Sequence, residues 1–188
     1  EDAYPHFTFI GPSPIDFHVV DTVKNTGEYV WPALHNFSLD KHIGSNTTHI
    51  GIVFNLDKHT EGGSHWVSLF INLIEDRIYY FDSNGNSTPT NVKKLVDKIK
   101  EQGLVLGKKF TLSTNYSNRH QQKNSECGIY VIYFMIQMLV YNNWDKFKHG
   151  KIKIQKPNTY RRFTKTSPVN CVAHDGIGGV MMTVLEAL

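Results

Sequence analysis

Residues 127–140 read CGIYVIYFMIQMLV, and this run is apolar on nearly all sides when it is wound as a helix. A helix that is hydrophobic all round lies inside a protein rather than at its surface. The residues just before it, 120–126, read HQQKNSE and are polar, which is typical of a loop. We therefore expect a buried central helix that begins at Cys127, with a polar loop leading into it.

Strand-like sequence lies upstream of this helix. Strands are indicated by short β-rich runs that are bounded by turn residues. Three such runs follow one another at residues 50–54, 65–73 and 77–83. Because only short polar segments separate them, we expect three adjacent strands of an antiparallel sheet.

Outside these strands the pattern is mixed. A helix is expected to open at Pro89, since apolar residues recur at helical spacing from 92 to 99, and Gly103 is expected to end it. Residues 104–115 return to strand character, broken at Gly107. The remaining expectations are a strand at 7–10, a turn at 11–14, an extended or helix-starting piece at 15–17, mostly loop over 21–48, a strand at 151–154, a short helix at 157–163, and a Gly-rich, then apolar end at 175–188.

These elements together predict an α+β fold with a central mixed or antiparallel sheet and a buried helix on its core side. The chain has 188 residues, which suits one hydrophobic core of ordinary size. No internal repeat or low-complexity segment marks a boundary. We therefore expect residues 1–188 to form a single domain.

The charge pattern does not indicate a strongly charged binding partner. The net charge is +3 and the basic residues form only short, scattered clusters, which favours solvated surfaces over nucleic-acid binding. No apolar run reaches the length of a membrane span, and no N-terminal signal segment is visible. The cysteines are Cys127 and Cys171, too few for a disulfide framework. An intracellular protein that contacts no membrane is expected.

Cys127 lies at the expected start of the central helix. A thiol there faces the positive end of the helix dipole and unpaired backbone N–H groups, which favour the thiolate. Gln121 and Gln122 lie just upstream and could supply an amide donor to an oxyanion beside the sulfur. Cys127 is thus a candidate nucleophile, and an inert buried cysteine is the alternative.

A base for that thiol is indicated by the expected hairpin. His65 begins one strand and Asp82 ends the next, and in a hairpin the start of one strand lies beside the end of its partner. We therefore expect the Asp82 carboxylate to accept a hydrogen bond from the His65 imidazole. The alternatives are a satisfied strand histidine, an aspartate that only ends a strand, and Asn84 as a substitute orienting amide. No second cysteine or histidine lies at zinc-ligand spacing near Cys127, so no metal is expected.

An ordered set of motifs resembles a known family, the Ulp1-like cysteine peptidases of clan CE. The motifs are His65-Trp66, Asp82-Ser83, a glutamine a few positions before the cysteine, and Glu126-Cys127-Gly128. The family includes the SUMO-specific proteases and the adenovirus-type maturation proteases. The resemblance covers about residues 48–145, and residues 9–17 look like the initial segment of related proteases of large DNA viruses. It implies the Ulp1/adenain-like cysteine proteinase fold.

The resemblance also implies roles for the residues of the site. Cys127 is the implied nucleophile, His65 the general base and then acid, and Asp82 the orienting carboxylate. Gln121 is the implied oxyanion donor, and Gln122 is the alternative donor. The alternative for Gln121 is a solvated loop side chain without a catalytic role.

Three residues are implied to contact the substrate. Trp66 matches an aromatic residue that roofs a narrow tunnel over the substrate's C-terminal glycines, and a plain core aromatic is the alternative. Gln122 and Gly128 are expected beside it. No cofactor is expected.

The implied activity is that of a cysteine endopeptidase that cleaves after Gly-rich sites, of the Gly-Gly or Gly-x-Gly type, through a thioester. The compact chain favours processing of viral capsid or structural precursors, in the host cytoplasm and the virion. Removal of SUMO, ubiquitin or a similar modifier is the alternative, and a catalytically silent binding module is a remote one. The expected partners are protein substrates with Gly-rich cleavage sites, with an activating peptide or weak nucleic-acid binding left open.

Overall fold

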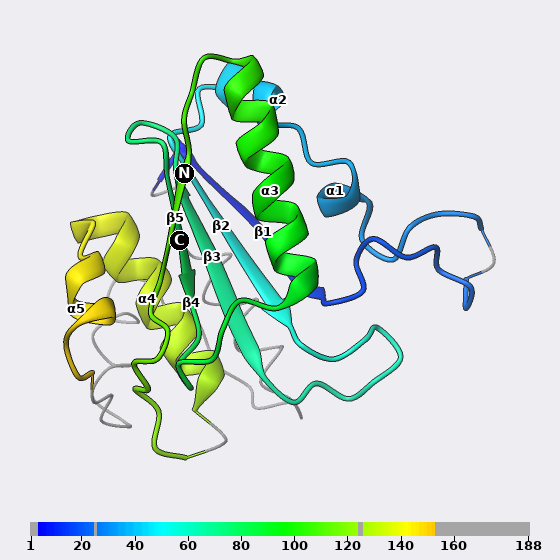
Figure 1. The fold of residues 1–188 in the computed structure, drawn as a ribbon. Coiled ribbons are helices and arrows are strands. Elements are labelled where there is room, and N and C mark those ends of the chain that lie inside the picture. Colours follow the sequence, from blue (N-terminus) through cyan, green and yellow to red (C-terminus); the bar gives the residue numbers. More distant parts are fainter. Residues whose placement is uncertain (1–3, 25, 124–125, 153–188) are drawn as a thin grey trace.

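The computed structural model describes residues 4–24, 26–123 and 126–152, and they build one five-stranded sheet (Figure 1). The strands lie across the sheet in chain order as β1 (Phe7–Pro14), β2 (His49–Asn55), β3 (Trp66–Asn72), β4 (Arg77–Phe81) and β5 (Thr111–Thr114). β2, β3 and β4 are antiparallel neighbours, as predicted, whereas β1 and β5 pair in parallel with β2 and β4. The sheet is therefore mixed, with an antiparallel centre.

Helices cover both faces of this sheet (Figure 1). One face carries α1 (Pro32–His35), α2 (Leu39–Gly44) and α3 (Thr90–Val105), and the other carries α4 (Cys127–Tyr141) and α5 (Trp144–Lys148). Parallel neighbours need a crossover connection, which α1 and α2 supply between β1 and β2, and α3 between β4 and β5. Residues 21–48, predicted to be mostly loop, thus contain two short helices.

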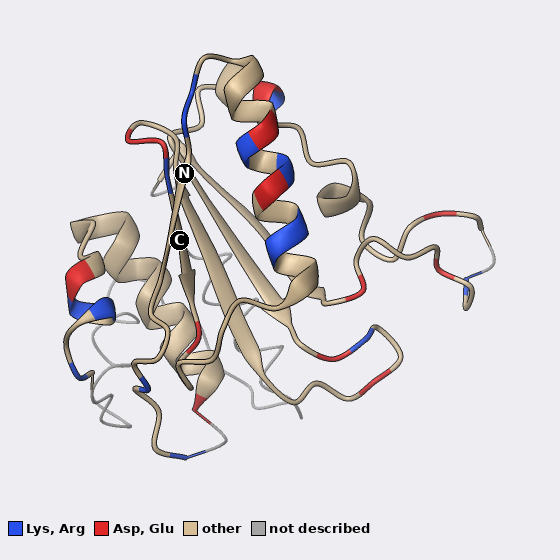
Figure 2. Ribbon diagram, viewed as in Figure 1, with Lys and Arg blue, Asp and Glu red and all other residues tan. Residues whose placement is uncertain are grey.

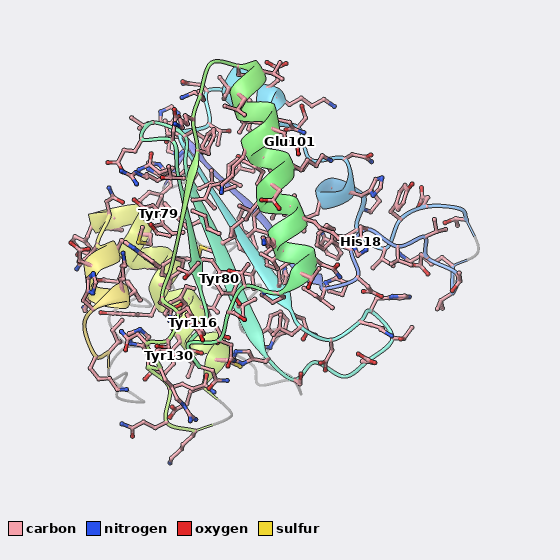
Figure 3. The ribbon with its side chains drawn as sticks, in the orientation of Figure 1. His18, Tyr79, Tyr80, Glu101, Tyr116 and Tyr130 are labelled. Atoms are coloured by element: carbon pink, nitrogen blue, oxygen red, sulfur yellow. The ribbon has the colours of Figure 1, made fainter. Side chains whose placement is uncertain are left out.

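The alternation of side chains along the strands divides the interior into two cores. Tyr79 and Tyr80 of β4 point to opposite faces of the sheet, toward α4 and α5 and toward α3 respectively (Figure 3). In β3, Leu69 joins the core under α3 and Phe70 the core under α4. The central strands are therefore buried on both faces, and they form a rigid support for the residues that directly precede β3 and follow β4.

α4 is the buried central helix that its sequence predicts. It begins at Cys127 and packs on β3 and β2, and most of its side chains as far as Met138 are buried. It ends at Tyr141, and the capping residue Asn142 has a left-handed conformation (φ 47°) that asparagine tolerates. Together with the mixed sheet, this helix confirms the predicted α+β fold class.

β1 continues through the segment where the sequence predicted a turn. Residues 11–14 stay in the strand, and the register with β2 shifts between Ile10 and Ser13, which marks a bulge. Gly11 lies within the bulge with φ 117°, and a Cβ there would come within 2.6 Å of the Val53 carbonyl oxygen. The predicted turn was wrong because the glycine bends an edge strand here without ending it.

α3 runs past the glycine that was expected to end it. The helix covers Gly103 and ends at Val105, so the strand predicted over 104–115 begins only at Thr111. A Cβ on Gly103 would lie 2.6 Å from the ring of Phe110. The prediction was wrong because this glycine admits a neighbouring ring and does not cap the helix.

Charged residues of both signs are interspersed along the chain, most clearly in α3 (Figure 2). There Lys93, Lys94, Asp97 and Glu101 are all exposed. Such a mixture gives no strong local attraction for a polyanion. None of the described helices is long and apolar enough to cross a membrane.

Several predictions concern the C-terminal part of the chain. Those for the helix at 157–163, the apolar end at 175–188 and Cys171 lie outside the described residues, as does the second half of the strand predicted at 151–154.

Candidate active site

Three segments that are distant in the sequence meet at one end of the sheet. His65 directly precedes β3, Asp82 directly follows β4, and Cys127 is the first residue of α4. β3 and β4 pair with Ser68 opposite Phe81, so the start of β3 lies beside the end of β4. His65 Nε2 is 2.6 Å from Asp82 Oδ1, and the two side chains are the neighbours that the hairpin predicts.

Asp82 is held from several directions and is fully buried. Its Oδ1 also accepts from the backbone N–H of Asn84 at 2.7 Å, and its Oδ2 accepts from the side-chain amide of Asn86 at 3.0 Å. The side chain of Asn115 binds the backbone N–H and C=O of Asp82, at 2.9 and 2.7 Å. These contacts fix the direction of the carboxylate and, through it, the imidazole of His65.

The surroundings of His65 and Cys127 favour an ion pair. Burial alone would lower the pKa of His65, but hydrogen bonds and charges from Asp82 and Cys127 outweigh burial and raise this pKa to about 9. Burial raises the pKa of Cys127, and the hydrogen bond with His65 and the N–H groups of Trp66 and Gly128 outweigh it and lower that pKa. Since Asp82 engages His65 Nε2, Nδ1 is the atom that faces the sulfur. A thiolate beside an imidazolium is therefore favoured.

The two adjacent glutamines have different surroundings. Gln121 is buried, its Oε1 accepts from the Ser83 hydroxyl at 2.5 Å, and its backbone N–H donates to the Ser83 carbonyl at 3.0 Å. Gln122 is exposed, and its backbone N–H donates to the Glu126 carboxylate at 3.2 Å. Gln121 is thus the glutamine that is attached to the segment carrying Asp82.

Trp66 and Gly128 both lie beside the sulfur of Cys127, because each directs its backbone N–H to it. The Trp66 side chain is half-buried and packs against the core under α4. Gly128 is buried in the first turn of α4. Of the predicted substrate-contacting residues, the structure brings these two to the cysteine and leaves Gln122 at the surface.

Sequence reasoning missed residues that support the site. Asn115 directly follows β5, and a polar residue at a strand end was the available signal for it. His120 is fully buried; its Nε2 lies 2.8 Å from the Phe147 carbonyl and its Nδ1 accepts from the Ile152 N–H at 3.3 Å. Burial lowers the pKa of His120, in keeping with a neutral ring. This ring holds the loop before Gln121 against the segment after α5.

The arrangement contains the groups that acyl transfer needs: a thiolate, an imidazolium, an orienting carboxylate and a nearby amide. Within the described ranges, no three His, Cys, Asp or Glu side chains form a group that could hold a metal ion.

The fold and the site are those of a cysteine-peptidase domain, and comparison with known proteins agrees. Residues 40–167 match the family model described as "Ulp1 protease family, C-terminal catalytic domain". The match takes in more than half of the chain and includes β2 to β5 and α4. The chain therefore belongs to the Ulp1 protease family, a family of cysteine-type peptidases.

Relatives of the chain occur in large DNA viruses, as the resemblance predicted. The Acanthamoeba polyphaga mimivirus protein named "Putative thiol protease R355" is 31% identical over 162 residues, which are 86% of this chain and 50% of the relative. "SUMO-1 cysteine protease S273R" of African swine fever virus is 34% identical over 87 residues, 45% of this chain and 32% of the relative. The chain thus spans half or less of the length of these curated relatives.

A solved structure gives the same picture of the fold. The crystal structure of the African swine fever virus pS273R protease matches with a TM-score of 0.62 and 25% sequence identity. The match covers 80% of this chain and 56% of that chain. The fold is thus shared with a viral protease of the family.

Proposed function

We propose that this chain is the catalytic part of an active cysteine endopeptidase that cleaves after Gly-rich sites in viral capsid or structural precursor proteins. The observation that carries the proposal is the hydrogen-bonded row of Asp82, His65 and Cys127, in which Asp82 Oδ1 and His65 Nε2 are 2.6 Å apart. Burying such groups costs stability unless they are paired, and strongly perturbed pKa values gather at functional sites. A catalytic role explains this hydrogen-bonded set of three residues better than a role in core packing does.

In the first half-reaction, the Cys127 thiolate attacks the carbonyl carbon of the scissile peptide bond. The oxyanion that forms accepts a hydrogen bond from Gln121 Nε2, which stabilises the tetrahedral intermediate. The C–N bond then breaks, His65 Nδ1 donates its proton to the leaving amine, and the acyl group remains on the sulfur as a thioester.

In the second half-reaction, the now neutral His65 takes a proton from a water molecule whose oxygen attacks the thioester carbon. The C–S bond breaks, which restores the thiolate beside the imidazolium, and the acid product leaves. Asp82 keeps the ring in the orientation that serves both steps, with Nδ1 toward the sulfur.

The preference for Gly-Gly or Gly-x-Gly sites is supported by the position of Trp66. Its backbone N–H donates to the reacting sulfur and its indole is half-buried, so we expect a substrate bound at Cys127 to pass close to the ring. Glycines fit beside a fixed ring where larger side chains would collide. Gly128, which has no side chain, leaves room on the α4 side, and Gln122 is exposed and free to contact the substrate further along.

A viral precursor as substrate is supported by the mimivirus and African swine fever virus relatives, and the host cytoplasm and the virion are the corresponding places of action. One observation favours the alternative of a modifier-removing protease, namely the name "SUMO-1 cysteine protease" that the African swine fever virus relative carries. The two substrate classes require different assays, and both can be run on the same protein.

The test combines a library of Gly-Gly and Gly-x-Gly peptides with ubiquitin and SUMO probes that carry a C-terminal electrophile. We expect the wild-type chain to cleave peptides, Cys127→Ala to cleave none, and neither probe to label the protein. Labelling of Cys127 by a modifier probe would instead favour the deconjugating function. Folded protein that reacts with neither reagent contradicts both activities and leaves the binding module. Adding candidate activating peptides or DNA to the same assay tests for an activator.

A further inference from the structure

Ser83 lies between the two halves of the site and takes part in both. It follows Asp82 directly and is fully buried. Its hydroxyl donates to Gln121 Oε1 at 2.5 Å, while its carbonyl accepts from the backbone N–H groups of His120 at 2.8 Å and Gln121 at 3.0 Å. The residue after the orienting carboxylate thus holds both the main chain and the side chain of Gln121.

The hydrogen bond to the hydroxyl bears on which end of the Gln121 carboxamide reaches the substrate. A carboxamide can present either its oxygen or its NH₂ group in a given direction, and the hydrogen-bond network decides which. The separation of 2.5 Å between Ser83 Oγ and the amide is in the range of O–H···O bonds and below that of N–H···O bonds. The oxygen therefore faces Ser83, and the NH₂ group faces away from it.

We propose that Ser83 is a positioning residue that orients the Gln121 carboxamide so that Nε2 serves as the oxyanion donor. The inference rests on the proposed peptidase function and adds to it a residue that acts through Gln121. Because Asp82 and Ser83 are consecutive, the end of β4 fixes the imidazole of His65 and the donor amide of Gln121 at the same time.

A purely structural role for Ser83 would instead predict that its loss disturbs the whole loop and therefore both reactions of Cys127. The bonds from the His120 and Gln121 N–H groups go to the Ser83 backbone carbonyl, so Ser83→Ala retains them and removes only the hydroxyl. The loop keeps its main-chain attachment while the amide becomes free to rotate. The expected loss therefore falls on the step that forms an oxyanion and not on the thiolate.

Two reactions of Cys127 separate these roles. Peptide hydrolysis passes through an oxyanion, whereas alkylation of the thiolate by iodoacetamide does not. For Ser83→Ala we expect kcat for a cleaved peptide to fall about 10- to 100-fold, which is less than the 10²- to 10³-fold cost of deleting an oxyanion donor outright. KM and the alkylation rate are expected to stay within about twofold of the wild-type values, because neither depends on the oxyanion.

Ser68→Ala is the matched control, since Ser68 is also a fully buried serine, and its hydroxyl has no hydrogen-bond partner within the described part of the chain. It is expected to leave kcat and alkylation unchanged. In a Gln121→Ala background, adding Ser83→Ala is expected to change kcat by less than about twofold, because the two residues act as a unit.

Three results would each overturn the inference. They are an unchanged kcat in Ser83→Ala, an equal fall in the rates of hydrolysis and alkylation, and additive losses of kcat in the double variant. If Ser83→Ala does not fold, Ser83→Cys is the deciding variant, because its thiol is a weaker donor at the same place. A fall confined to kcat supports the role, and no fall overturns it. A wild-type chain that is alkylated but hydrolyses no peptide contradicts the proposed function itself, and the role of Ser83 falls with it.

Discussion

Two histidine–aspartate pairs in this molecule have nearly the same hydrogen-bond length. His65 Nε2 is 2.6 Å from Asp82 Oδ1, and His59 Nδ1 is 2.7 Å from Asp16 Oδ2. Both histidines are in the segment between β2 and β3. A short bond to a carboxylate therefore does not by itself distinguish a catalytic histidine.

The difference lies in the second nitrogen of each ring. The second nitrogen of His65 faces Cys127, whereas His59 Nε2 has no hydrogen-bond partner among the described residues and lies 3.8 Å from Asp21 Oδ1. The backbone N–H of His59 also donates to Asp16, at 3.0 Å. The pair of His59 and Asp16 thus connects the loop before β3 to the segment after β1, and among the described residues only the His65–Asp82 pair faces a thiol.

The largest expected effect separates the two histidines. His65→Ala removes the proton donor and acceptor and is expected to lower kcat/KM for a cleaved peptide by about 10³- to 10⁴-fold. His59→Ala removes a brace and is expected to cost less than about twofold in kcat/KM and about 1 kcal/mol of unfolding free energy. Steady-state kinetics and urea unfolding of both variants check this. Similar activity losses in the two variants would erase the distinction.

The next effect concerns the aspartates and pH. The carboxylate of Asp82 helps to raise the pKa of His65 to about 9, and the active form needs this imidazolium, so wild-type activity is expected to fall as pH rises through about 9. In Asp82→Asn the negative charge is gone, the pKa of His65 falls, and this alkaline limb moves to lower pH, with kcat about 10²-fold lower.

Asp16→Asn is the control for that profile. It alters the other pair and is expected to leave the alkaline limb where it is in the wild type. A pH–rate profile of kcat/KM for the three proteins measures the limb directly. An alkaline limb that does not move in Asp82→Asn would show that Asp82 has no influence on the proton of His65.

The smallest expected effect concerns the support of Asp82. Asn115→Ala leaves the buried backbone N–H and C=O of Asp82 without their side-chain partner, so we expect about 1–3 kcal/mol of lost stability. A displaced carboxylate is also expected to lower kcat by up to about tenfold. Asn118→Ala is the matched control, since its side chain binds the carbonyls of Phe147 and Gly150 and not Asp82. Asn118→Ala should lose stability while keeping kcat.

The parts of the fold that local pattern determines could be predicted from the sequence. The all-round apolar run predicted α4, and short β-rich runs separated by polar segments predicted the antiparallel strands β2, β3 and β4. The neighbourhood of His65 and Asp82 followed from the hairpin alone, because an antiparallel pair fixes which ends meet.

The parts that depend on distant partners could not be predicted. β5 is parallel to β4 across a helical crossover, and without that pairing nothing placed Asn115 at the backbone of Asp82. Gly11 and Gly103 were interpreted as chain breakers because the contacts that require them, with Val53 and the Phe110 ring, are made only in the folded protein. The bond from Ser83 to Gln121 likewise joins two loops that are far apart in the chain.

The proposed chemistry requires that Cys127 is a thiolate held by the imidazolium of His65. The most direct measurement is an ultraviolet titration of thiolate absorbance in the folded wild-type chain, from which the titration of Cys127→Ala is subtracted so that tyrosines and Cys171 cancel. We predict a thiolate that forms well below the ordinary pKa of cysteine, and that His65→Ala moves it upward. A Cys127 thiol that ionises at or above its ordinary pKa in the wild-type protein would contradict the account.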